Sequence, residues 1–381
     1  MTLFQDTGGD PRAVRAQVAD VLAWFGAAGD AALGNAPGFA VRKASLAVAI
    51  AKVAEFSQAD CDAIYFAGLL HGIGAIVNPA YRKGNALPER AARQERWDAP
   101  AQGARICAAI GSLPRETEDM VRWQHEAWDG TGYPDALRWA GIPKPAQILG
   151  LADRFVAAQD PEESLSQIGL ESGRSFSPVS VRAFTMWFHR AGGEIELLSV
   201  PIDALQDAPP DAEALLDHFA DLIDVHNGVE GRWRRVARIA DATGEAMHVE
   251  TAARRGLALA ARIFGAGELD AESVEDEAFD PLARLGIDDR ARNAQAAARL
   301  AVPYESLRDA AEIVAARGEW FDGTGKPGGL SHKDIANATQ SLSAAIAFDR
   351  LDRSERLDTA AGTQFDPAVV RTMMEAAKLR T

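Results

Sequence analysis

The sequence predicts an all-α protein built from two tandem helical domains. Apolar residues recur every three or four positions near the start of the chain and again after residue 211, a spacing that lines one face of a helix. Alternating apolar and polar residues, the pattern of a half-buried strand, are scarce, and the best strand candidate is the segment 195–201. A loop motif that occurs twice divides the chain into two similar halves.

The repeated motif reads QHEAWDGTGYP at residues 124–134 and RGEWFDGTGKP at residues 317–327. In each copy, two glycines permit positive φ angles and a proline fixes the exit from the loop. Asp129 and Asp322 are 193 residues apart, and the same interval relates separate blocks on both sides of the loop. Matched pairs include Arg42 with Arg235, Gly72 with Gly265, Gly74 with Gly267, Gln147 with Gln340 and Phe155 with Phe348. Farther on, an interval of 189 pairs Gly173 with Gly362 and Phe176 with Phe365. Because separated blocks share one interval, the sequence indicates a duplication.

The duplication sets the expected domain organisation. We expect a first domain at residues 1–195, a linker at 196–211 and a second domain at 212–381, because the polar run 206–211 contains two prolines. Duplicated domains in one chain tend to keep the packing of an ancestral dimer. We therefore expect the two domains to form a pseudo-dimer about a pseudo-twofold axis.

Composition narrows the class of partner. The formal net charge is −15, and a nucleic-acid polymer needs clustered Lys and Arg, so we expect no such partner. Cys61 and Cys107 are too few for a disulfide framework and fit a reducing compartment. No signal-peptide pattern and no apolar run of membrane-spanning length is apparent, so we expect a cytoplasmic protein without a membrane span. The acidic run from Glu268 to Glu277 is expected to be a solvated loop.

Several motifs occur in the order typical of one protein family. They are Leu69-Leu70-His71-Gly72-Ile73-Gly74, Lys83-Gly84 with Leu87, the loop motif at 124–134, Ile142-Pro143 and Ala152-Asp153-Arg154-Phe155. Together they resemble the HD-GYP family, a branch of the HD-domain metal-dependent phosphohydrolases, over about residues 15–190. The resemblance implies an all-helical fold. For a typical member it also implies hydrolysis of cyclic di-GMP at a centre of two or three iron or manganese ions.

The resemblance further implies about seven metal ligands, of which this chain keeps His71, His125 and Asp153. The bridging aspartate of the His-Asp pair is Gly72, and the first histidine of the His-His-Glu segment is Gln124. Cations held close together repel one another without a shared carboxylate. We therefore expect either no metal or a single divalent ion of the iron or manganese type at the three remaining ligands. The alternative is that these ligands are relics, hydrogen-bonded in a closed pocket.

The second copy has lost more of the ligand set. The interval of 193 carries the implied ligand positions to Arg232, Phe264, Gly265, Gly318 and Ile346. Apart from an arginine, none of these side chains ligates a cation. We expect the second domain to bind no metal and to serve as a packing partner or a binding surface.

The resemblance also implies a loop that reads a ligand or docks a partner. Its residues here are Glu126, Asp129, Gly130, Thr131, Gly132, Tyr133 and Pro134. Lys83 and Arg154 are the nearest remaining cations for a phosphate, whereas the stretch after Asp153 offers Asp160 in place of basic groups. A doubly charged dinucleotide would therefore lack much of its usual electrostatic clamp. The structural alternative is that the loop is simply a stable helix-to-loop turn.

Three functions remain open at this point. The first is a degenerate signalling protein that binds cyclic di-GMP or a signalling protein without hydrolysis and has no assigned catalytic residue. The second is an active metal-dependent cyclic di-GMP phosphodiesterase with a reduced metal site in the N-terminal half. The third is an interaction module in which neither half binds a ligand. We favour the first because Gly72 offers no bridging carboxylate, although Glu126 could restore one from another helix.

Overall fold

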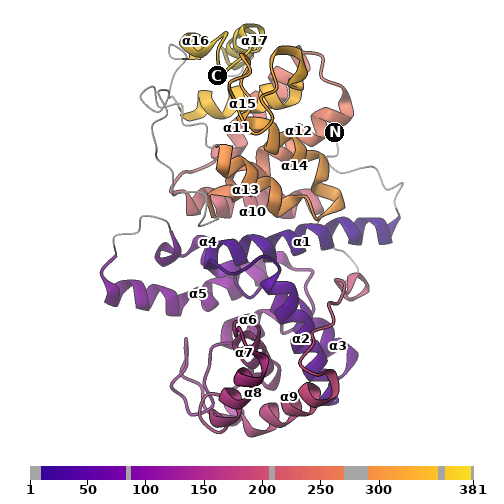
Figure 1. The fold of residues 1–381 in the computed structure, drawn as a ribbon, viewed down its shortest axis with the longest axis vertical. Helices are drawn as coiled ribbons and strands as arrows, with labels where there is room; N and C mark the ends of the chain where they lie inside the picture. Colours follow the sequence, from indigo (N-terminus) through magenta and orange to yellow (C-terminus); the bar gives the residue numbers. More distant parts are fainter. Residues whose placement is uncertain (1–9, 83–86, 206–210, 270–290, 351–356, 379–381) are drawn as a thin grey trace. The chain divides into compact units, whose positions relative to one another are not determined.

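The computed structural model describes residues 10–82, 87–205, 211–269, 291–350 and 357–378. Within these ranges every regular element is an α-helix or a 3-10 helix, so the predicted all-α fold class is confirmed (Figure 1). The chain divides into two compact units, one formed by Gly9–Ala212 and the other by Glu213–Thr381. These are called the first and second units below.

The helices of the two units follow the order of the chain. The first unit contains α1 (Pro11–Leu33), α2 (Phe39–Val53), α3 (Gln58–Leu69), α4 (Ile73–Val77), η1 (Pro79–Tyr81), α5 (Glu89–Ile110), α6 (Thr117–Trp123), η2 (Trp139–Gly141), α7 (Lys144–Val156), α8 (Pro161–Leu170), α9 (Pro178–Ala191) and η3 (Ile202–Ala204). The second unit contains α10 (Ala212–His226), α11 (Arg232–Ala246), α12 (Thr251–Ile263), η4 (Phe264–Leu269), α13 (Ala291–Ala301), η7 (Glu305–Leu307), α14 (Arg308–Ala315), η8 (Ala316–Gly318), η9 (His332–Asp334), α15 (Asn337–Arg350), α16 (Leu357–Ala360) and α17 (Pro367–Lys378).

Helix α2 is the centre of the first unit, because it packs against α1, α3, α7 and α9. Its apolar face buries Leu46 and Ile50 completely. Helix α3 crosses so close that a Cβ atom on Gly68 would lie 2.6 Å from the Cα atom of Ala44. Only glycine permits that approach, which fixes the end of α3 and the residues that follow it, including His71.

The duplication has a clear counterpart in the hydrogen bonds. In the first unit Glu126 accepts the amide of Leu137 at 2.9 Å, and in the second unit Glu319 accepts the amide of Leu330 at 2.7 Å. These pairs are related by the interval of 193. An isolated bridge joins Ser172 to Phe176 and another joins Ala361 to Phe365, related by the interval of 189. Both intervals read from the sequence therefore correspond to repeated structure.

The segment 195–201, our best strand candidate, forms no strand, and its prediction was wrong. It has no regular secondary structure and is hydrogen-bonded to α2 and α3 instead. The Leu198 amide donates to Ser45 Oγ at 3.0 Å, and the Tyr65 hydroxyl donates to the Leu198 carbonyl at 3.0 Å. Farther on, Leu205 is only 2% exposed. Residues 196–205, expected to be linker, thus pack on the first unit, while 206–210 lie outside the described residues.

One stretch of the described residues, Gln58–Val77, is long and apolar enough to cross a membrane by length and composition. No run of this length was apparent from the sequence, and the expectation that the chain has no membrane span stays a prediction. The stretch spans α3 and α4, and 83% of its most apolar window is buried inside the protein. Its apolar character is used in the core of the first unit.

Candidate functional site

The site in the first unit is built around a lysine that the sequence analysis did not single out. Lys43 lies on α2, and its side chain is completely buried. Its neighbours on the same helix face, Ala40, Ala44 and Ala47, are buried and small, which leaves room for the long side chain to extend inside the unit. Val236 is the residue at the interval of 193 in the second unit, where it is fully buried.

The ammonium group of Lys43 joins two of the implied metal-ligand positions. Nζ donates to Asp153 Oδ1 at 2.6 Å and to Gln124 Oε1 at 2.6 Å. The Gln124 amide nitrogen in turn donates to the His71 carbonyl at 3.1 Å. The Lys43 ammonium group therefore lies among residues at which the resemblance places metal ligands, and Gln124, at the position of a ligand histidine, accepts a hydrogen bond from it.

The charges in this cluster shift one another's pKa values. Burial raises the pKa of the Asp153 carboxyl, but attraction to Lys43 and the two histidines outweighs it and holds the pKa below its usual range. Burial lowers the pKa of Lys43, against the attraction of Asp153. Burial, together with the Lys43 charge, lowers the pKa of His71 to about 3. Removal from water also lowers the pKa of His125 to about 4. At neutral pH the two imidazoles are therefore neutral, beside the hydrogen-bonded pair of Lys43 and Asp153.

A buried aspartate supports the cluster from α1. Asp30 is 2% exposed, and its Oδ2 accepts the Ala40 amide at 2.9 Å near the start of α2. Its Oδ1 lies 4.0 Å from His71 Nε2. Burial raises the pKa of Asp30 to about 7, although the Ala40 amide, Asn35 and Lys43 oppose the shift. Asp30 was not predicted as a site residue, because an aspartate inside a helix gives no signal of burial.

The three predicted metal ligands line one cavity of about 290 Å³. Its wall also carries Tyr133, whose ring stacks on His125 with centroids 5.1 Å apart. Arg96, from α5, lines the cavity as well. The prediction that Lys83 and Arg154 are the nearest cations therefore overlooked Arg96, which lies in the stretch where the two halves are least similar.

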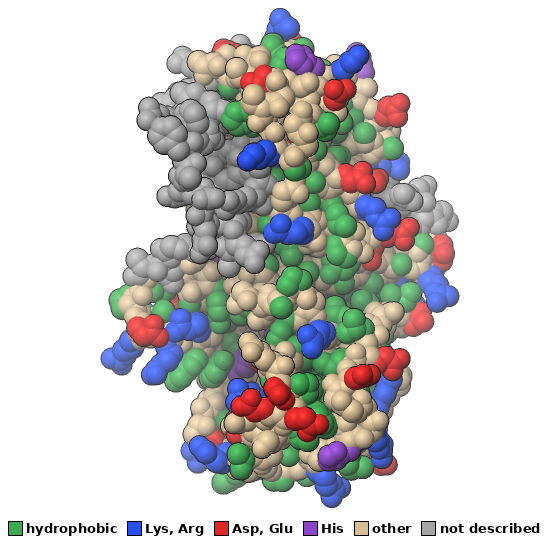
Figure 2. All heavy atoms as spheres, in the orientation of Figure 1, with side chains coloured by type: hydrophobic (Ala, Val, Ile, Leu, Met, Phe, Trp, Pro, Cys, Tyr) green, Lys and Arg blue, Asp and Glu red, His purple; other side chains and the backbone are tan. Residues whose placement is uncertain are grey.

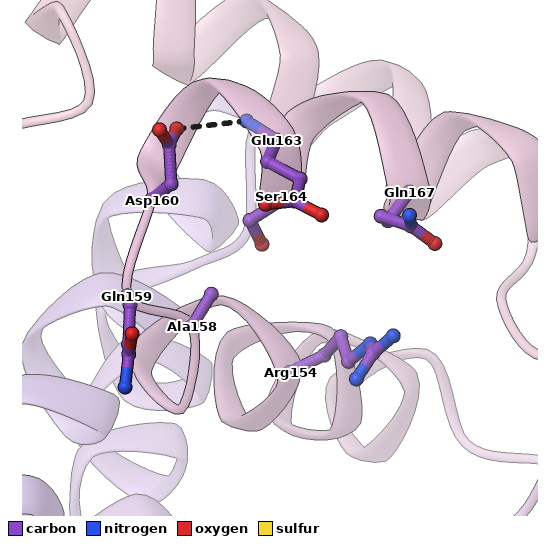
Figure 3. Close-up of a pocket in the computed structure, with 7 residues that line it drawn as sticks. All are labelled: Arg154, Ala158, Gln159, Asp160, Glu163, Ser164 and Gln167. Carbon is purple, nitrogen blue, oxygen red and sulfur yellow. Dashed lines mark hydrogen bonds between the residues drawn. The ribbon is translucent and has the colours of Figure 1, made fainter.

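Arg154 does not lie in that cavity. It lines a separate cavity of about 280 Å³ between the end of α7 and α8, with Asp160, Glu163 and Gln167 (Figure 3). Successive residues on a helix point about 100° apart, so Asp153 and Arg154 face different cavities. Lys83, the other predicted cation, lies outside the described residues.

The predicted ligand loop is largely satisfied by its own hydrogen bonds. Asp129 Oδ1 accepts from the Thr131 amide and hydroxyl at 3.0 and 2.6 Å. Glu126 accepts the Asp135 and Leu137 amides at 2.7 and 2.9 Å, so its carboxylate is committed to the loop and not to a metal bridge. The cavity lining includes Tyr133 but not the other predicted loop residues, Glu126, Asp129, Gly130, Thr131, Gly132 and Pro134. These contacts are those expected if the loop is a stable helix-to-loop turn, the structural alternative to a ligand loop.

The residues present do not fit a two-metal centre. Gly72 supplies no bridging carboxylate, and Lys43 already donates to Asp153 Oδ1. Across the described ranges, no three His, Cys, Asp or Glu side chains are arranged to hold a metal ion. The Nε2 atom of His71 is buried without a hydrogen-bond partner among the described residues, so it is available to ligate a single ion.

In the second unit, other side chains occupy the positions that correspond to the candidate metal ligands. Phe264 and Ile346 occupy the positions of His71 and Asp153, and both are buried. The Arg232 guanidinium lies over the Phe264 ring at 5.3 Å from its centroid. Glu268, expected to be part of a solvated loop, pairs with Arg350 at 2.9 Å, so that expectation was wrong for this residue. The rest of that acidic run, from residue 270 on, lies outside the described residues.

Basic side chains are interspersed with acidic and uncharged ones on the face shown in Figure 2. That face offers no continuous basic surface of the kind that a nucleic-acid backbone needs. The expectation that the chain binds no nucleic-acid polymer stays a prediction.

Comparison with known proteins gives a consistent family. The sequence model described as HD domain matches residues 30–171 and again residues 217–375. The 3′3′-cGAMP-specific phosphodiesterase 3 of Vibrio cholerae is 27% identical over 244 residues, which are 59% of this chain and 52% of that protein. The cyclic di-GMP phosphodiesterase of Thermotoga maritima is 31% identical over 148 residues, 35% of this chain and 40% of that protein. The chain thus spans about half or less of the length of these relatives.

A solved structure resembles the whole chain. The crystal structure of a cyclic GMP-AMP specific phosphodiesterase from V. cholerae aligns with a TM-score of 0.68 at 17% identity, covering 96% of this chain and 98% of that one. At this identity the likeness supports the fold and leaves the chemistry to the residues themselves.

Proposed function

Since the chain belongs to the HD-domain family, in its cyclic dinucleotide phosphodiesterase-like branch, we propose that its first unit binds a cyclic dinucleotide without hydrolysing it. In this proposal the protein is a signalling receptor, or a scaffold for a signalling protein, rather than an enzyme. The carrying observation is the Lys43 ammonium group, which is held between Asp153 and Gln124.

Charge repulsion supports the proposal that the first unit lacks an ordinary catalytic metal centre. A divalent ion at Asp153 would lie close to the Lys43 ammonium group, and like charges at such separations repel strongly in a site shielded from water. Displacing Lys43 would leave an ammonium group without its acidic partner inside the unit, which costs several kcal/mol. The internal ion pair therefore competes directly with metal binding.

The cavity still offers contacts for an anionic nucleotide. Arg96 supplies a guanidinium fork for a phosphate, and the polar side chains of Asn35 and Tyr81 also line the wall. The cavity of about 290 Å³ is at the small end of ligand pockets, so we expect it to enclose one part of a dinucleotide and leave the rest outside. The relatives named for cyclic dinucleotides support this class of ligand.

Metal content and turnover test the proposal together. Wild-type protein loaded anaerobically with Fe²⁺ or Mn²⁺ should retain no metal in the first unit and should not cleave cyclic di-GMP or 3′3′-cGAMP. Lys43→Ala removes the internal cation and frees Asp153 to turn toward His71 and His125, so this variant should bind about one divalent ion through the three side chains. The double variant Lys43→Ala, Asp153→Asn should lose that ion again. Stoichiometric metal in the wild type, with turnover that Asp153→Asn abolishes, would refute the proposal.

Ligand binding is tested separately by calorimetry. Arg96→Met should weaken cyclic di-GMP binding by about 10- to 100-fold, the worth of a charge-assisted hydrogen bond. Arg105→Met is the matched control, because Arg105 is exposed on the same helix and does not line the cavity. Absence of saturable binding to the wild type would leave the interaction module, in which neither half binds a ligand, as the better reading.

One observation favours the second candidate, a residual phosphodiesterase with a single ion. His71 Nδ1 contacts the Gly68 carbonyl at 3.0 Å, so Nε2 carries the lone pair, and it has no hydrogen-bond partner. His125 and Asp153 line the same cavity. This candidate requires Lys43 to leave Asp153, and the metal measurement on the wild-type protein decides between the two.

A further inference from the structure

The second unit buries an arginine whose charge is poorly matched. Arg232 begins α11 and is 6% exposed. Its Nε and Nη2 atoms have no hydrogen-bond partner within the described residues. The nearest acid, Glu268, lies 3.6 Å from Nη1, and Phe264 covers one face of the guanidinium group.

Such an arrangement is costly without a further partner. A guanidinium group carries five donors and stays charged at any ordinary pH. Glu268 is shared with Arg350, whose Nη2 lies 2.9 Å from the same Oε1 atom. Asp224 is also nearby, but its carboxylate accepts the Trp233 amide at 3.2 Å and caps α11. Arg232 and Arg350 thus share the Glu268 carboxylate, and within the described residues the Nε–Nη2 edge of Arg232 has no acceptor.

The residues around this edge correspond in sequence to residues that line the cavity of the first unit. The interval of 193 relates Arg232, Glu268 and Arg350 to Phe39, Ala75 and Ala157, all of which line the cavity of the first unit. In the second unit the positions of Lys43 and Asp153 are taken by Val236 and Ile346, which are fully buried and apolar. The charge there is therefore carried by different residues, and no acid stands at the place of Asp153.

We propose that the Arg232 and Arg350 guanidinium groups bind a tetrahedral oxyanion, a phosphate or the phosphoryl group of a nucleotide, in the second unit. The Nε and Nη2 donors of Arg232 form a fork that matches two oxygens of such an anion. The Glu268 and Arg350 side chains are 20% and 21% exposed, so the rim of the site reaches solvent. The site is independent of the function proposed for the first unit.

Calorimetric titration of the full-length protein with inorganic phosphate, at constant ionic strength, tests the site. Wild-type protein should show saturable binding, and Arg232→Met should weaken it by about 10- to 100-fold. Arg234→Met is the matched control, because Arg234 lies on the same helix in an exposed ion pair with Asp221 and should leave phosphate binding unchanged. Equal affinity in the wild type and Arg232→Met, or no saturable binding to the wild type, overturns the proposal.

Two further arms separate the source of the anion and guard against misfolding. A nucleoside monophosphate that binds more tightly than inorganic phosphate identifies a nucleotide phosphoryl group, whereas equal or weaker binding identifies free phosphate. Arg232→Lys keeps the charge but lacks the fork, so it should fold and still lose affinity. If Arg232→Lys binds phosphate as tightly as the wild type does, the Nε–Nη2 fork does not hold the anion and the proposal fails. The loss of affinity caused by Arg232→Met should persist when Arg96→Met is also present in the first unit, which separates this site from the proposed dinucleotide site.

Discussion

At the scale of single residues, Asp30 makes the stability of the first unit depend on pH. Burial raises its pKa from 3.8 to about 7, so the folded protein keeps the proton over a range in which the unfolded chain has lost it. The contribution of Asp30 to the free energy of unfolding therefore falls as pH rises from about 4 to about 7, and is constant above that. His71 and His125 act in the opposite direction, because their folded pKa values of about 3 and 4 lie below 6.5.

We predict that Asp30→Asn removes the loss of stability that the buried Asp30 carboxyl causes at neutral pH. The variant should match the wild type near pH 4 and exceed it at pH 8 by on the order of 3 kcal/mol. The asparagine oxygen can still accept the Ala40 amide, so α2 should keep its start. Urea unfolding of both proteins at a series of pH values measures the difference, in which the histidine contributions largely cancel. A difference that does not change with pH would contradict the buried, protonated carboxyl.

Lys43 shows why the site could be predicted only in part. The three candidate metal ligands His71, His125 and Asp153 were predicted from their motifs, and the structure brings them to one cavity. The lysine that pairs with Asp153 lies on a helix whose other buried positions, apart from Ser45, are apolar. A charged residue in such a helix is normally predicted to be solvent-exposed unless its partner is known. The duplication held a signal, because the interval of 193 pairs Lys43 with Val236. A lysine at a position that the other copy fills with a core residue indicates a buried charge.

At the scale of elements, the repeated loop was the most predictable part of the site. Its glycines and proline signalled a fixed turn, and the equivalent hydrogen bonds of Glu126 and Glu319 occur in both units. What the sequence left open was the role of the loop. The structure shows Asp129 and Thr131 bonded to each other and only Tyr133 among the predicted loop residues lining the cavity. The polar residues of a short loop form hydrogen bonds either with one another or with a ligand. The sequence pattern is the same in both cases, so it did not distinguish a structural turn from a ligand loop.

We predict that Gly132→Ala severely destabilises the first unit. A Cβ atom there would lie 2.1 Å from the Ala127 nitrogen and 2.5 Å from the His125 carbonyl oxygen, and neither backbone atom can move without disrupting the loop. The free energy of unfolding should drop by more than about 4 kcal/mol, as expected for a substitution with a specific steric cause. Far-UV circular dichroism during urea unfolding measures the loss.

Gly141→Ala is the matched control for that prediction. Gly141 ends η2, and a Cβ atom added to it meets no other atom within 4 Å. This variant should stay within about 0.5 kcal/mol of the wild type. Gly325→Ala in the second unit should repeat the effect of Gly132→Ala, because its Cβ would lie 2.2 Å from the Trp320 nitrogen. Similar stability of Gly132→Ala and Gly141→Ala would show that the loop is not rigidly packed.

At the scale of the whole molecule, the duplicated all-α organisation was predictable because two intervals run through the chain. The family model matches the chain twice, at residues 30–171 and 217–375, and each match falls within one compact unit. The pseudo-twofold packing of the units stays a prediction. The end of the first domain was harder to place, because residues 196–205 combine polar and apolar positions without a helical period. Their attachment depends on Ser45 and Tyr65, more than 130 residues earlier in the chain.

The attachment of residues 196–205 predicts where the first unit can be truncated without a loss of stability. A fragment of residues 9–212 should be more stable than one of residues 9–195, because the shorter fragment loses the buried Leu205 and the two hydrogen bonds of Leu198. Burial of one leucine and two hydrogen bonds together are worth about 3 to 5 kcal/mol. Urea midpoints of the two fragments measure this difference. In the full-length protein, Leu205→Ala should reproduce about 2 kcal/mol or more of it. Leu197→Ala should have little effect, because Leu197 is 60% exposed. Equal midpoints for the two fragments would mean that residues 196–205 are a linker after all.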